Sequence, residues 1–162
     1  MDDEIVKLLA ERDISLTEAL SDWAIKCLES GYDSKSLRIL ASMSKWDSTS
    51  ESDTYFQRSL KELGWDKLDR QDYLLRYAEI LAGEIVGNKI DPIEAALEIY
   101  AILKDLDHPA ELHDFIVIDE MVWDYEYFLK TGYQGYYYHT KEKLISEIKK
   151  LSEELLKSKE II

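Results

Sequence analysis

Residues 91–105 read DPIEAALEIYAILKD, and this stretch decides the fold class. Asp91 is a favoured N-cap residue, and proline at the first helical position lacks only an N–H that has no partner inside the helix. Apolar residues then recur at helical spacing: Ile93, Ala96, Leu97, Tyr100 and Leu103. The stretch therefore predicts a capped amphipathic helix with this stripe facing inward.

The same signals recur through most of the chain. Helices are predicted at 3–12, from Leu16 to Gly31, at 34–44, before Gly64, and at 69–87, 109–119 and 140–159. Residues 120–139 predict a short helix, interrupted at Gly132, and then an aromatic irregular segment. Only 6 glycines and 2 prolines occur. We therefore predict an all-α fold.

The connections between these predicted helices are short, and no linker stands out. We therefore expect a compact single domain of eight or nine helices over residues 1–162, with 140–162 as a long amphipathic C-terminal helix. Residues 16–44 and 69–105 each predict a pair of helices, so a HEAT-like stack of helix pairs is an alternative arrangement.

The charge balance limits the classes of partner. The chain has 20 Lys and Arg against 34 Asp and Glu, a formal net charge of -14. Such a surface repels nucleic-acid phosphates and attracts basic proteins. The alternative interpretation is that the negative charge serves only to keep the protein soluble. Cys27 is the single cysteine, so an internal disulfide and a zinc site built on several thiolates are excluded.

The expected compartment is the cytoplasm. The N-terminus, MDDEIVKLLAERD, lacks the basic start and long apolar run of a secretory signal. No run approaches the roughly 18 apolar residues of a membrane span. We therefore expect no membrane partner.

Residues 105–129 segregate charge most sharply, because they contain eight acids and neither Lys nor Arg. The same stretch holds Phe115, Trp123, Tyr125, Tyr127 and Phe128. Acids mixed with aromatics suit a surface that docks a basic protein, but they also suit a solvated acidic face whose rings belong to the core. The predicted partner-binding residues are Asp107, Glu111, Asp114, Asp119, Glu120, Trp123, Asp124, Tyr125, Tyr133 and Tyr136.

The tyrosines of the segment 133–138 admit two interpretations. Tyrosine supplies large contact area at low entropic cost in recognition surfaces. It also packs loops onto a helical core while its hydroxyl stays in water. The packing interpretation is favoured here.

The sequence offers no recognisable catalytic centre. His108 and His113 are five residues apart, which does not place two ligands on one helical face, and HPAELH matches neither H-E-x-x-H nor H-x-x-E-H. Cys27 lies on an apolar stripe and predicts a core residue. We predict no catalytic residue, no metal site and no cofactor. An unfamiliar enzyme using carboxylates and histidine near 107–120, with or without a metal, stays open as an alternative.

The last predicted helix carries Leu144, Ile148, Leu151 and Leu155 at coiled-coil-like spacing. This stripe either covers the core of its own domain, which is the commoner arrangement, or forms a homodimer.

Two segments resemble small, uncharacterised all-helical bacterial proteins, some of which are similar to immunity or accessory proteins of toxin systems. They are LSDWAIKCLESGYDSKSLRILASM (20–43) and DPIEAALEIYAILKDLDHPAELHDFIVID (91–119). The resemblance implies an all-helical fold and a bacterial cytoplasmic setting, and it transfers no functional residue. The leading hypothesis is a non-catalytic acidic module that binds a basic protein, in the manner of an immunity-type inhibitor of a basic toxin or nuclease.

Overall fold

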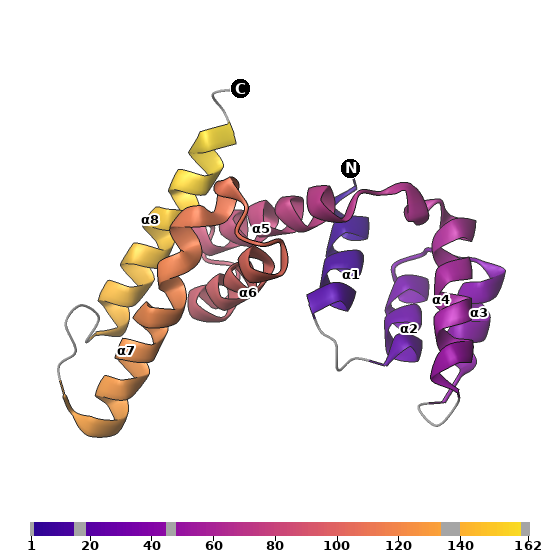
Figure 1. The fold of residues 1–162 in the computed structure, drawn as a ribbon, viewed down its shortest axis with the longest axis horizontal. Helices are drawn as coiled ribbons and strands as arrows, with labels where there is room; N and C mark the ends of the chain where they lie inside the picture. Colours follow the sequence, from indigo (N-terminus) through magenta and orange to yellow (C-terminus); the bar gives the residue numbers. More distant parts are fainter. Residues whose placement is uncertain (1, 15–18, 45–47, 134–139, 160–162) are drawn as a thin grey trace. The chain divides into compact units, whose positions relative to one another are not determined.

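A computed structural model describes residues 2–14, 19–44, 48–133 and 140–159 (Figure 1). Within these ranges the regular elements are all helical, as predicted, and no strand occurs. The α-helices are α1 (Asp3–Ile14), α2 (Leu20–Glu29), α3 (Lys35–Ser42), α4 (Thr49–Leu63), α5 (Arg70–Val86), α6 (Pro92–Asp105), α7 (Ile118–Thr131) and α8 (Lys141–Lys159). Two 3₁₀ helices are η1 (Trp65–Lys67) and η2 (Ala110–Val117). The described residues thus contain eight α-helices, within the expected eight or nine.

Contacts divide the chain into two compact units, Met1–Tyr73 and Leu74–Ile162. The first holds α1 to α4 and the start of α5, and the second holds the rest of α5 and the elements that follow it. The expectations of a single domain and of HEAT-like pairing stay predictions. In the described ranges no helix is both long and apolar enough to cross a membrane.

The core of the first unit is built around Trp23 of α2. Its indole N–H donates to the backbone oxygen of Leu8 on α1, at 2.9 Å, which satisfies the polar atom of a buried ring. The rings of Phe56 and Trp65 meet Trp23 edge-on, with centroids 5.0 and 6.3 Å away. Cys27 is buried on the same helix, in agreement with its prediction as a core residue.

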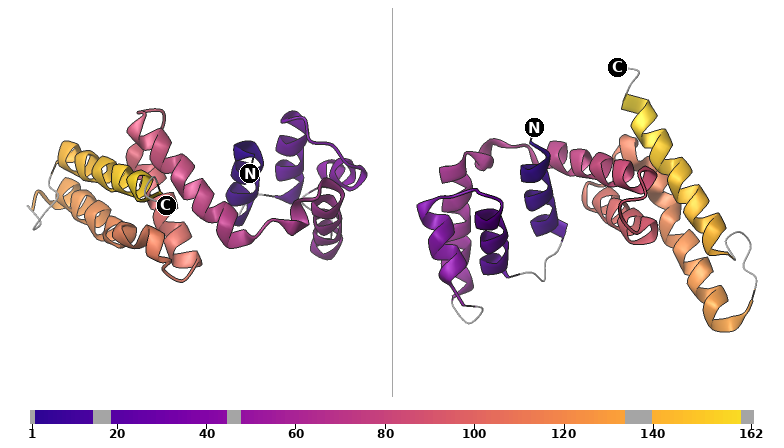
Figure 2. Two further views of the ribbon diagram at one scale, coloured as in Figure 1. Left: turned by 90° about the horizontal axis from the view of Figure 1, so that it is seen from above. Right: turned by 180° about the vertical axis from the view of Figure 1, so that it is seen from behind.

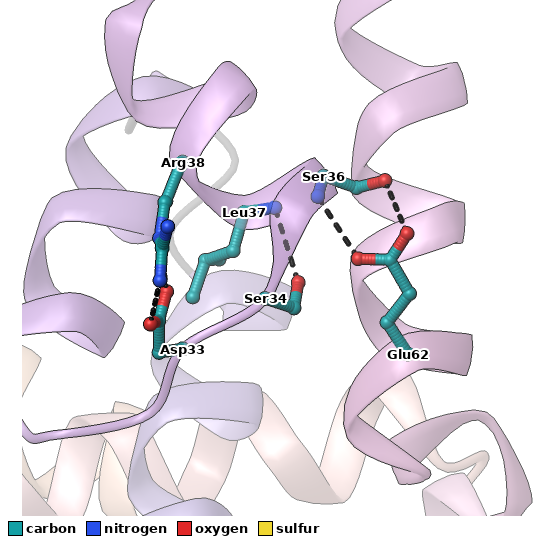
Figure 3. Close-up of polar contacts among 6 residues, drawn as sticks. All are labelled: Asp33, Ser34, Ser36, Leu37, Arg38 and Glu62. Atoms are coloured by element: carbon teal, nitrogen blue, oxygen red, sulfur yellow. Dashed lines mark hydrogen bonds and ion pairs between the residues drawn. The ribbon is translucent and has the colours of Figure 1, made fainter.

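Polar contacts fix the beginning of α3 in the first unit (Figure 3). The Ser34 hydroxyl accepts the backbone N–H of Leu37 at 3.2 Å, so Ser34 is the N-cap of α3. Just before it, Asp33 forms an ion pair with Arg38. Side chains that are close in the sequence therefore contribute to the cap of α3.

The second unit packs α6 against η2, α7 and α8, and α7 against α8. Helices α7 and α8 run side by side in opposite directions in both Figure 1 and Figure 2. Its core contains Ile99, Ile102, Leu112, Phe115 and Ile118.

The apolar stripe of α8 is buried in the second unit: Leu144, Ile148, Leu151 and Leu155 are all covered. Because α8 contacts α6, α7 and η2, the stripe covers the core of its own unit. A homodimer formed through this stripe would require α8 to leave that core.

Two helices predicted within the second unit are present but differ from the expectation in helix type or first residue. The predicted α-helix over 109–119 is the 3₁₀ helix η2 up to Val117, and α7 begins at Ile118. The short helix predicted after residue 120 is part of α7, which continues to Thr131 and ends at Gly132 in the left-handed conformation. A 3₁₀ helix has three residues per turn, so Leu112 and Phe115 lie on one side of η2, and both are buried in the core.

Candidate functional site

The candidate surface begins in the turn after α6. Asp107 and His108 both have positive φ, 55° and 62°, and the backbone N–H of His108 donates to the Leu103 oxygen, closing the end of α6. The Asp107 side chain is fully exposed as a result. Glu111 and Asp114 are exposed on η2, each directly before a buried residue, Leu112 and Phe115 respectively. The carboxylates in this part of the stretch thus face solvent.

Helix α7 places the next predicted residues. Ile118, Met121 and Val122 are buried, and Tyr125 and Phe128 are half-buried, so these residues mark the inner side. We call the exposed residues Asp119, Glu120, Trp123, Glu126 and Tyr127 the α7 outer face. Residues three and four positions apart are neighbours on a helix, so Trp123 has the other four members around it.

Three aromatic rings are in contact on this side of the molecule. Trp123 is 60% exposed and stacks on Tyr127, with centroids 5.1 Å apart and ring planes 15° apart. Tyr133 is 59% exposed and meets Tyr127 edge-on at 6.1 Å. Gly132, with φ of 68°, ends α7 and turns the chain between these two tyrosines. The rings form an exposed aromatic cluster in a helical unit whose other large side chains are mostly buried.

Within residues 104–130, the lysines lie at the two ends of the segment. Lys104, before the stretch, lies over the Tyr100 ring with Nζ 5.5 Å from its centroid. Lys130, after it, pairs with Glu126 at 3.8 Å across one helical turn. Between Lys104 and Lys130, the segment therefore contains carboxylates and aromatic rings but no Lys or Arg.

The structure separates the predicted residues into three groups. Exposed are Asp107, Glu111, Asp114, Asp119, Glu120, Trp123 and Tyr133, whereas Asp124 and Tyr125 are half-buried. Tyr136 lies outside the described residues, as do Tyr137 and Tyr138. Phe115, whose ring belonged to the predicted docking stretch, is 1% exposed and belongs to the core.

Sequence reasoning missed Tyr127 as a member of the site and chose Tyr125 instead. The signal was present in the spacing, because position 127 is four residues after Trp123 and therefore shares its face of the helix. Position 125 is two residues away and turns toward the opposite side.

The histidines and carboxylates of this region are residue types that bind metal ions. Among the described residues, no group of three or more His, Cys, Asp or Glu side chains is placed to hold a metal ion. The Nδ1 atom of His108 is 3.9 Å from Oδ1 of Asp107.

A second surface feature lies on the first unit. An open hollow follows one side of α4 and is lined by Ser50, Asp53, Thr54, Gln57, Arg58 and Lys61. Its charges are mixed and its lining contains no aromatic ring, so it lacks both properties of the second unit's surface.

Comparison with protein-family models, curated proteins and solved structures gives no match to this chain.

Proposed function

We propose that this protein is a non-catalytic binding module for a basic protein, and that the α7 outer face with the exposed carboxylates of η2 is its contact surface. The observation that carries the proposal is the exposed Trp123–Tyr127 stack inside a segment with eight acids and no Lys or Arg. Tryptophan and tyrosine are enriched among the residues that dominate binding energy at protein interfaces.

The exposure of the rings favours binding over a role in the core. A tryptophan needed for packing is buried, as Trp23 is at 1% exposure, whereas Trp123 leaves 60% of its surface in contact with water. Leaving that much apolar area in water forgoes the stabilisation of burial, about 25 cal/mol for each Å². A partner that covers the rings would recover this free energy.

The charge of the chain sets the chemistry of the partner. A net charge of -14 accelerates encounter with a positively charged protein, and the carboxylates around Trp123 disfavour acidic competitors. A basic toxin or nuclease held inactive by this chain, as an immunity-type inhibitor holds its target, is the specific form of the proposal. In that form the acidic surface occupies the target's basic, nucleic-acid-binding face.

The test uses the purified products of the genes adjacent to this one, together with two variants of equal charge change. In the first, Asp114, Asp119 and Asp124 become Asn and Glu120 becomes Gln. In the control, four exposed carboxylates of the first unit are neutralised in the same way: Glu29, Glu51, Asp53 and Asp66. Affinity is measured by calorimetry at two salt concentrations.

We expect one basic product to bind the wild type and the control variant. Its affinity should fall by at least tenfold in the first variant, and rising salt should weaken the wild-type complex because exposed charges are screened. The proposal is wrong if no basic product binds, or if both variants bind as the wild type does.

A further inference from the structure

In the aromatic cluster on α7, Tyr127 is the middle ring and Trp123 is at one end. Tyr127 contacts Trp123 through its face and Tyr133 at 6.1 Å, so it lies between the two other rings. Trp123 stacks on Tyr127 with nearly parallel planes, which occupies only one of its two faces. With Tyr127 stacked against it, Trp123 is still 60% exposed, which is the exposure expected of an indole whose second face is uncovered.

Two carboxylates lie beside this end of the cluster. Asp119 and Glu120 are four and three residues before Trp123, and both are exposed. Helical side chains lean toward the N-terminus of their helix, so a tryptophan covers the turn before its own position. The indole and the two carboxylates therefore border the same patch of surface.

We propose that this patch binds an arginine side chain of the partner, an inference that rests on the proposed function and names the group recognised. The guanidinium plane stacks on the open face of Trp123, while its N–H groups donate to the carboxylates of Asp119 and Glu120. A planar, weakly hydrated cation with several fixed donors satisfies the ring and the carboxylates together. The lysine ammonium is compact and strongly hydrated, so it matches the carboxylates but stacks less well.

Charge disfavours a second copy of this chain that meets this patch through its own α7 outer face. Each copy carries -14, and the α7 outer face would meet Asp119, Glu120 and Glu126 of the other copy. Lys130, the cation next to that face, is already paired with Glu126. A basic segment from another protein brings the complementary charge.

The test uses three nine-residue peptides in which glycine alternates with four arginines, four lysines or four citrullines. Citrulline keeps a planar side chain but carries no charge. The full-length protein is titrated with each peptide at low salt, and the indole N–H signal of Trp123 is followed by NMR. The signal is assigned from Trp123→Leu, and circular dichroism establishes that this variant remains helical.

We expect the arginine peptide to shift the Trp123 signal and to bind roughly two- to fivefold more tightly than the lysine peptide. In Trp123→Leu the two affinities should become equal, while Asp119→Asn with Glu120→Gln should weaken both and keep their ratio above one. The citrulline peptide should not bind measurably.

Equal binding of the arginine and lysine peptides to the wild type, or a Trp123 signal that does not move, overturns the inference and leaves the proposed function standing. Absence of binding by both cationic peptides also overturns it. Failure of the proposed function is recognised separately, by the neutralised four-carboxylate variant binding the basic gene product as the wild type does.

Discussion

Glu62 on α4 accepts two hydrogen bonds from Ser36 on α3. The Ser36 hydroxyl donates to Oε1 at 2.7 Å and the Ser36 backbone N–H donates to Oε2 at 2.9 Å (Figure 3). Ser36 is in the first turn of α3, where backbone N–H groups have no partner inside the helix. The carboxylate therefore joins two helices of the first unit at a position where the helix dipole also favours negative charge.

This contact predicts that acid weakens the first unit. The backbone hydrogen bond from Ser36, followed by that from its side chain, lowers the pKa of Glu62 below its ordinary value. A carboxyl whose pKa is lower in the folded state stabilises that state fully above the unfolded pKa, about 4.3, and loses the effect as pH falls through the folded value. The urea midpoint of the wild type should exceed that of Glu62→Gln at pH 7, and the difference should shrink below about pH 4.

The control for this experiment is Glu29→Gln, an exposed carboxylate at the end of α2 in the same unit. It should not reproduce the pH-dependent difference. A gap between the wild type and Glu62→Gln that stays constant from pH 7 to pH 2.5 would show that the charge of Glu62 contributes nothing.

The N-cap of α6 gives a second prediction. Asp91 Oδ1 accepts the backbone N–H groups of Ile93 at 2.9 Å and Glu94 at 3.1 Å, as expected for an aspartate before Pro92. Asp91→Ala should lower the free energy of unfolding by about 1 kcal/mol, whereas Asp91→Ser should recover most of it. Chemical denaturation measures both, and equal losses in the two variants would contradict the capping role.

The caps show how far local sequence predicts this fold. Asp91 caps α6 as predicted, and Ser34 and Asp69 cap α3 and α5 in the same way, because capping depends on residues two or three positions away in the chain. The pairing of Glu62 with Ser36 joins residues 26 apart, and no local pattern encodes it.

The spacing of apolar residues predicts the inward side of a helix poorly where the helix is apolar on most of its sides. In α6 the expected inner stripe included Leu97 and Tyr100, which are half-buried, whereas Ile99 and Ile102 are fully buried. Several stripes of α6 are apolar, so packing against η2, α7 and α8 decides which one faces inward. In η2 the buried Leu112 and Phe115 are three residues apart, a spacing that α-helices and 3₁₀ helices share, so the sequence did not distinguish the two.

For the candidate site, the sequence predicted the acidic stretch and Trp123 but not which other rings share its face. Exposure of an aromatic side chain depends on which helices pack against its own. The contact between Tyr127 and Tyr133 further depends on the turn at Gly132. These relationships follow from the packed unit and not from composition.

Two glycines predict opposite effects of the same substitution. A Cβ at Gly132 or at Gly83 would meet nothing within 4 Å, so sterics with neighbours do not distinguish them. Gly132 has φ of 68°, which costs an alanine about 1 kcal/mol, whereas Gly83 lies inside α5, where alanine gains about 0.5–1 kcal/mol. Thermal denaturation should therefore place the melting temperature of Gly132→Ala below the wild type and that of Gly83→Ala above it.

A lower melting temperature for Gly83→Ala would mean that α5 needs flexibility at that position. A Gly132→Ala variant as stable as the wild type would show that α7 can end without the left-handed turn. In that event the edge-on contact of Tyr133 with Tyr127 would not depend on Gly132.

Phe115 and Trp123 test whether the exposed cluster serves stability or binding. Phe115 is 1% exposed, and Phe115→Ala should cost about 3–5 kcal/mol through lost burial and the cavity left behind. Trp123 is 60% exposed and its main ring partner is Tyr127, so Trp123→Ala should cost about 1 kcal/mol or less. Urea denaturation compares the two variants. If Trp123→Ala destabilised the protein as much as Phe115→Ala does, its ring would be a structural element, and the surface proposed to receive a basic partner would lose its central residue.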